Sequence, residues 1–161
     1  MTHEARQVPL PPNARALCSL PRIDYEDCFV VETDDAMELS AEEWARRILE
    51  GAPTRFKVSA PATWLALGLK HGLPWSDDNI LGWPIRRSEP DFVVLGAQSR
   101  TGMPAELLVK RDKSSVLIAT LIQHRGPVMK RVWSFVEGPH QRIVPALLAR
   151  GVRAQRLAGA R

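Results

Sequence analysis

Two histidines and one arginine near the C-terminus are the side chains best suited to acid–base chemistry. His140 follows directly after Gly138 and Pro139, while His124 and Arg125 are adjacent at the end of an apolar run. An imidazole exchanges protons near neutral pH, and a guanidinium can polarise a carbonyl group. His140 or His124 is therefore a candidate acid–base residue, with Arg125 as the polarising group.

Two of these side chains, His140 and Arg125, also have a structural explanation. A proline inside a helix frees a backbone carbonyl in the preceding turn, and the His140 imidazole could bond that carbonyl. The end of a strand commonly reaches solvent, which would account for the charge at Arg125. The sequence leaves both explanations open.

Residues 116–125 are a strand candidate whose two faces differ in polar content. Side chains alternate along a strand, so Thr120, Ile122 and His124 share one face and Arg125 lies on the other. Both faces are apolar at their centres. The pattern therefore leaves undecided which face lines the interior.

The segment of residues 126–148 predicts a long amphipathic helix that positions His140. Its apolar side chains recur at steps of three and four, the period of one helix face. Gly138 and Pro139 should bend the helix axis. Such a helix buries its stripe by lying across a sheet. The stripe consists of Met129, Trp133, Val136, His140, Ile143 and Leu147.

The segments before this helix predict an antiparallel sheet. Short loops rich in turn formers connect the last four of five strand candidates, so these strands are antiparallel neighbours. Ser40 and Glu43 form a capping box that begins one helix, and Ser59 is the cap candidate of a second. The predicted fold class is α+β, a curved antiparallel sheet of five or more strands around a long C-terminal helix, with two short helices after the first strand. The strand candidates are residues 25–33, 80–87, 92–99, 105–112 and 116–125.

Composition predicts one ordinary globular domain with an N-terminal arm and a C-terminal tail of different composition. Residues 1–22 are rich in proline and predict an extended arm, residues 23–150 the domain, and residues 151–161 a basic tail. The net charge is +4, and from Pro127 onward seven Lys or Arg accompany one Glu. Arginine also suits the C-terminal end of a helix dipole, and no nucleic-acid motif accompanies these charges, so nucleic acid is not an expected partner.

Other function classes lack their signatures. The histidines, His3 and His71 included, have no paired spacing to Cys or carboxylate, so no metal site is expected. A phosphate-binding glycine loop and a G-x-S-x-G nucleophile are absent, and no cofactor is expected. Solvated loops and strand edges explain the acidic residues Glu26, Asp27, Asp34, Asp35, Asp77 and Asp78.

The two cysteines and the hydropathy pattern predict a reduced, cytoplasmic protein. Cys18 and Cys28 are too few for a disulfide framework. The N-terminal residues lack the apolar core of a secretory signal. No apolar run approaches the roughly 20 residues that span a membrane, so no membrane span is expected.

Three segments and the order of the elements resemble the helix-grip fold of the START/Bet v1-like (SRPBCC, polyketide cyclase-like) superfamily, in particular its small uncharacterised bacterial branch. The segments are LSAEEWARRILEG at 39–51, PDFVVLG at 90–96 and RVWSFVEGPHQRIVPALL at 131–148, and the likeness spans about residues 24–150. It implies an interior cavity between sheet and helix that takes lipid-like or polyketide-like compounds. Trp75 and Trp83, which flank a loop, could wall its mouth or simply pack. The expected ligand-binding residues are Trp75, Trp83, Thr120, Ile122, Met129, Trp133, Val136 and His140.

Three functions follow as hypotheses. The first is binding of a hydrophobic small molecule between the sheet and the C-terminal helix. The second is an enzyme of cyclase, aromatase or dehydratase type that uses His140 or His124 with Arg125. The third is a structural or protein-interaction domain without a ligand, and a homodimer is kept as a candidate assembly.

Overall fold

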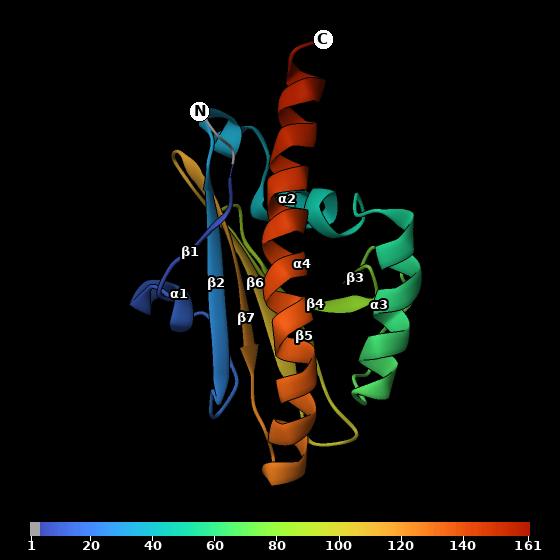
Figure 1. Cartoon of the computed structure of the whole chain (residues 1–161). Coiled ribbons are helices and arrows are strands. Elements are labelled where there is room, and N and C mark those ends of the chain that lie inside the picture. Colours follow the sequence, from blue (N-terminus) through green and yellow to red (C-terminus); the bar gives the residue numbers. More distant parts are fainter. Residues whose placement is uncertain (1–3) are drawn as a thin grey trace.

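The core of the fold is a seven-stranded antiparallel sheet. In the computed structural model, which describes residues 4–161, the strands follow the order β1-β2-β7-β6-β5-β4-β3 (Figure 1). An α+β fold with an antiparallel sheet and a long C-terminal helix is therefore confirmed. The strands are β1 (Arg6–Gln7), β2 (Tyr25–Glu32), β3 (Asn79–Ile80), β4 (Trp83–Ser88), β5 (Phe92–Ala97), β6 (Ala105–Asp112) and β7 (Ser115–Ile122).

Two of the strands were not expected from the sequence. β1 has two residues, too few to show an alternating pattern. The strand predicted at residues 80–87 is divided into β3 and β4. Leu81 and Gly82 lie between them with φ angles of 49° and 87°, a left-handed turn that reverses the chain.

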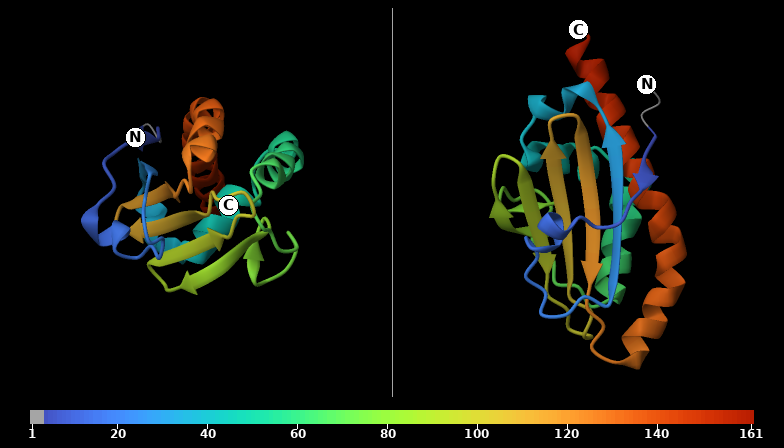
Figure 2. Two further views of the ribbon diagram at one scale, coloured as in Figure 1. Left: turned by 90° about the horizontal axis from the view of Figure 1, so that it is seen from below. Right: turned by 90° about the vertical axis from the view of Figure 1, so that its left-hand side faces the viewer.

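The long helix α4 (Pro127–Gly159) lies across one face of the sheet. It runs without interruption through Pro139 and Pro145, although its axis bows, as Figure 2 shows. The segment predicted as a basic tail continues this helix, because Val152 is fully buried and Gly151 lies directly against Ile48 of a neighbouring helix. Within residues 4–161, no helix combines the length and the apolar character that crossing a membrane requires.

Three helices follow β2: a 3-10 helix η1 (Asp34–Glu38), then α2 (Ala41–Leu49) and α3 (Thr54–Ala66). The capping box of Ser40 and Glu43 is present, as the sequence predicts. The prediction that the second helix starts at Ser59 is wrong, because α3 starts at Thr54 and holds Pro61 in its interior. Proline has a helix-compatible φ, so the ring removes one hydrogen bond without ending the helix.

The N-terminal arm covers the face of the sheet opposite α4. It contributes β1 and the short helix α1 (Pro12–Arg15), whose Ala14 is fully buried. Both faces of the sheet are therefore buried, which explains why both faces of β7 are apolar. The first three residues of the predicted arm, His3 among them, lie outside the described residues. The core on this outer face consists of Ala14, Cys28, Val30, Val94, Leu108, Leu117, Ala119 and Leu121.

Candidate functional site

A cavity of about 200 Å³ lies between the sheet, α3 and α4. Both helices lie on the same face of the sheet and stand side by side over it (Figure 2). Most of the lining is aliphatic or aromatic, and a few hydroxyls and one imidazole interrupt it. The lining residues include Leu49, Phe56, Trp64, Leu67, Trp83, Met103, Leu107, Ile118, Thr120, Ile122, Trp133, Val136, His140, Val144 and Leu147.

Six of the eight residues expected to bind a ligand are brought together around this cavity. Ile118, Thr120 and Ile122 form the inward face of β7, which resolves the alternation that the sequence left open. The six are Trp83, Thr120, Ile122, Trp133, Val136 and His140.

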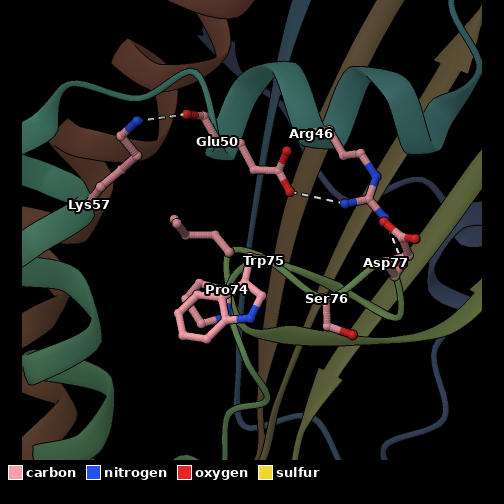
Figure 3. Close-up of a pocket in the computed structure, with 8 residues that line it drawn as sticks. Arg46, Glu50, Lys57, Pro74, Trp75, Ser76 and Asp77 are labelled. Atoms are coloured by element: carbon pink, nitrogen blue, oxygen red, sulfur yellow. Dashed lines mark hydrogen bonds and ion pairs between the residues drawn. The ribbon is translucent and has the colours of Figure 1, made fainter.

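The remaining two lie elsewhere. Met129 is buried one turn before Trp133, outside the cavity lining. Trp75 is 77% exposed and borders a separate surface depression of about 470 Å³ between α2, α3 and the loop that follows α3 (Figure 3). Arg46 in this depression is already bonded: it donates to the Glu50 carboxylate and to the backbone carbonyl of Asp77, as Figure 3 shows.

The other two acid–base candidates do not reach the cavity. His124 is buried beyond the end of β7, and neither of its ring nitrogens has a hydrogen-bond partner among residues 4–161. Burial lowers the pKa of this imidazole. Arg125 is exposed and borders a depression on the opposite face of the sheet, near Ser19 and Glu106. The structure therefore separates Arg125 and His124 from His140.

His140 instead pairs with a carboxylate that the sequence did not single out. Its Nε2 lies 2.9 Å from Oδ2 of Asp27 and 3.1 Å from Oγ1 of Thr120. The same Oδ2 accepts a 2.7 Å hydrogen bond from the Tyr25 hydroxyl, which in turn accepts one from Gln141. These contacts form a polar cluster at the edge of an otherwise apolar cavity.

Asp27 is a correction to the expectation that the acidic residues are solvated. Its side chain has no exposed surface, and its Oδ1 has no hydrogen-bond partner among the described residues. Alternation along β2 places Tyr25, Asp27, Phe29 and Val31 on the inward face. This alternation along the strand can be read from the sequence. An acidic residue in step with Phe29 and Val31 was the signal that could have identified it.

The chemistry of each group assigns the donors and acceptors of this cluster. A carboxylate only accepts, so the hydroxyl of Tyr25 donates to Oδ2 of Asp27, whereas the hydrogen bond of His140 Nε2 is to Oγ1 of Thr120. Burial, and then the hydrogen bond to Asp27, raise the pKa of Tyr25, so its phenol keeps the proton that it donates. Nδ1 of His140 is then the ring nitrogen that has no hydrogen bond to a described residue.

Two indole N–H groups are also unpartnered at the cavity. Trp83 and Trp133 are nearly fully buried and line it, yet no described residue accepts from either Nε1. Most buried polar groups in proteins have a partner, so two orphaned donors around one cavity are notable. Next to Trp83, burial lowers the pKa of His71, whose ring also contacts Trp64.

The cluster shows no metal-binding geometry. Among residues 4–161, no three His, Cys, Asp or Glu side chains are grouped as they would be around a metal ion. Comparison of the chain with protein-family models and with curated proteins finds no match.

Proposed function

We propose that the protein binds a small, largely apolar molecule in the cavity between the sheet, α3 and α4. The observation that carries this proposal is the cavity itself, about 200 Å³ in volume and lined mainly by apolar side chains. Ligand pockets are typically concave and apolar with a few polar groups that orient the ligand. His140 and Thr120 are such groups here.

The proposal includes assignment of the fold to the helix-grip class of the START/Bet v1-like superfamily. A seven-stranded antiparallel sheet, helices after the first long strand and a C-terminal helix across the sheet all support it. A cytoplasmic location is part of the same proposal, because Cys18 and Cys28 are both free thiols. The homodimer and the protein-interaction domain stay predictions from the sequence.

The volume limits the size of the ligand. A buried cavity of roughly 150 Å³ accommodates a benzene molecule, whereas pockets for drug-sized compounds measure roughly 300–1,000 Å³. About 200 Å³ therefore suits a single substituted ring. A polyketide chain or a lipid would require α3 and α4 to move apart.

Titration with p-xylene tests the proposal. Isothermal titration calorimetry and thermal unfolding should show saturable binding and a rise in Tm, since a ligand that binds the folded state stabilises it. Ala60→Phe should abolish both effects, because Ala60 is buried and lines the cavity. Ala62→Phe is the matched control, on the same helix but exposed and outside the lining. Absence of binding to the wild type, or equal binding by both variants, would overturn the proposal.

The pairing of His140 with Asp27 favours acid–base catalysis as a second candidate. A buried carboxylate that orients an imidazole is a recurring arrangement in general-base catalysis. Arg125 is exposed on the other side of the sheet, so it takes no part in this candidate. In the simplest reaction, Nδ1 of His140 removes a proton from the carbon next to a ketone and returns a proton from solvent.

Hydrogen–deuterium exchange tests this second candidate. Cyclohexanone is small enough for the cavity, and NMR follows the loss of its α-protons in D₂O. The wild type should accelerate exchange above the buffer rate, and His140→Gln should lose that acceleration. Exchange at the buffer rate with wild-type protein would exclude this activity for simple ketones and leave ligand binding as the function.

A further inference from the structure

The polar end of the cavity contains one ring nitrogen that forms no hydrogen bond with any of residues 4–161. Nε2 of His140 is hydrogen-bonded to Thr120 and lies 2.9 Å from Oδ2 of Asp27, and no described residue forms a hydrogen bond with Nδ1. His140 lines the cavity, and its side chain is 16% exposed. Nδ1 is therefore the atom of this imidazole that is left for a bound molecule.

Thr120 adds a hydroxyl beside the imidazole. The residue is 3% exposed and lines the cavity, and its hydrogen bond is to Nε2 of His140. When Nε2 carries the proton, Oγ1 of Thr120 accepts it, and the hydroxyl proton of Thr120 is left to be donated to a ligand. The same end of the cavity thus offers a ring nitrogen, Nδ1, and a hydroxyl donor on the Nε2 side of the ring.

Trp133 supplies a second donor at the same end. Its ring centroid lies 5.2 Å from that of His140, and its Nε1–H is buried without an acceptor among residues 4–161. Burying an unpaired donor costs roughly 1–3 kcal/mol in proteins. An oxygen atom on the ligand would satisfy it.

Charge at the site restricts the ligand further. Asp27 already places a buried carboxylate directly behind His140, so an anionic ligand would bring a second negative charge close to the first. The apolar walls disfavour a cation, which would lose its hydration without a carboxylate in the lining. A hydroxyl is uncharged and both donates and accepts, so it can bond Nδ1 whether the imidazole is neutral or charged.

We propose that the cavity selects a small neutral ring compound with a hydroxyl group, a phenol or a cyclic alcohol, whose oxygen binds at the polar end formed by His140, Thr120 and Trp133. This inference rests on the ligand-binding function proposed above. The apolar walls supply affinity for the ring, and the polar cluster supplies selectivity for the hydroxyl.

A pair of ligands with equal shape separates the two proposals. p-Cresol and p-xylene differ by a hydroxyl in place of one methyl group. Calorimetric titration of the wild-type chain should give p-cresol at least tenfold tighter binding than p-xylene, and p-toluate, the corresponding carboxylate, should bind more weakly than either. Equal affinity for p-cresol and p-xylene would overturn the selectivity and leave the apolar cavity function intact. Binding of neither compound would overturn the proposed function itself, and this inference with it.

The conservative variant Thr120→Val locates the hydroxyl. It should weaken p-cresol binding about fivefold and leave p-xylene binding unchanged, so p-xylene serves as the control for an intact cavity. Equal loss for both ligands would mean that the substitution disturbs the cavity and that the cresol oxygen is not held there.

A spectroscopic readout on the wild type decides the outcome if this variant fails to fold. The ¹⁵N signal of His140 Nδ1 should shift on addition of p-cresol and stay in place with p-xylene. An Nδ1 signal that ignores p-cresol at saturation would overturn the assignment.

Discussion

Asp27 Oδ2 and His140 Nε2 lie 2.9 Å apart, and the Asp27 side chain has no exposed surface. A strand near the N-terminus and a helix near the C-terminus thus join through one charged or hydrogen-bonded pair inside the core. The Tyr25 hydroxyl donates to the same carboxylate oxygen, so Oδ2 of Asp27 has two close polar neighbours, whereas no residue among 4–161 bonds Oδ1. The pair affects stability as well as the proposed binding.

Replacing one partner of the Asp27–His140 pair should lower the free energy of unfolding more than replacing both. His140→Leu removes the imidazole from a buried carboxylate, and breaking a buried pair in this way typically destabilises by about 3–5 kcal/mol. The double variant Asp27→Leu/His140→Leu replaces the pair with apolar volume and should recover at least ~1 kcal/mol of that loss. Urea unfolding of the wild type, both single variants and the double variant measures this coupling. Additive losses would show that the two side chains do not interact.

Stability should fall in mildly acidic solution because of His124 and His71. Burial lowers the pKa of both imidazoles below the ordinary value of 6.5. The unfolded chain then binds protons at a higher pH than the folded chain does. The contribution of these two neutral histidines to the free energy of unfolding is fully present above about pH 6.5. It is lost as the pH falls from there through their folded-state pKa values.

The substitution His124→Leu should flatten part of this pH dependence. Burial lowers the pKa of His124, although the nearby Asp24 carboxylate acts to raise that pKa. Urea midpoints measured between pH 7.5 and 5 check the slope. An unchanged slope in His124→Leu would contradict the assignment, and adding His71→Leu should flatten the slope further.

Two glycines of α4 should respond differently to alanine. A Cβ on Gly151 would lie 2.8 Å from Cγ1 and 3.2 Å from the Cα of Ile48, so α2 and α4 would have to separate. Gly151→Ala should therefore destabilise by about 1–3 kcal/mol. Gly138→Ala is the matched control on the same helix, because beyond the local helix backbone no atom of residues 4–161 lies within 4 Å of the added carbon.

The control should change the free energy of unfolding by no more than about 0.5 kcal/mol. Alanine favours a helix, but the following Pro139 opposes a helical residue that carries a Cβ. Equal Tm shifts for both variants would show that the approach of α2 to α4 at Gly151 is looser than described.

Cysteine labelling should report on the N-terminal arm. Burial, together with the nearby Glu106 carboxylate, raises the pKa of Cys18 to about 12, and burial raises the pKa of Cys28 to about 12. Both thiols stay protonated at pH 8, so their reaction with a disulfide reagent should be slow in the folded protein.

A variant with one cysteine isolates the arm. In Cys28→Ala, only Cys18 reacts, and the added substitution Glu106→Gln should accelerate labelling severalfold. Glu106 accepts hydrogen bonds from the backbone N–H and hydroxyl of Ser19, next to Cys18. The amide loses the charge that strengthens these bonds and the charge that opposes the thiolate. An unchanged rate would show that Glu106 does not hold this part of the arm.

Local signals in the sequence were sufficient for several elements. Ser40 and Glu43 sit three residues apart, and the capping box that they form depends on the adjacent backbone alone. The spacing of Trp133, Val136 and His140 places them on one helix face, and all three line the cavity. Residues 105–112 read as a strand and form β6 within the same bounds.

Contacts between distant segments were not readable in the same way. The inward face of β7 could not be chosen from its own residues, because the arm makes the opposite face equally apolar. Asp27 looked solvated until His140, more than a hundred residues later, supplied its partner. The last turns of α4 looked like a charged tail because their burial depends on α2, which lies far away in the sequence.

The positions of the five tryptophans allow intrinsic fluorescence to report on the cavity. Trp64, Trp83 and Trp133 line the cavity, Trp44 is fully buried with its N–H bonded to the Ala36 carbonyl, and Trp75 is exposed. Replacing Trp44 and Trp75 with phenylalanine would leave intrinsic fluorescence that originates entirely beside the cavity. Emission wavelength and quenching would then report the contents of the cavity without any added label.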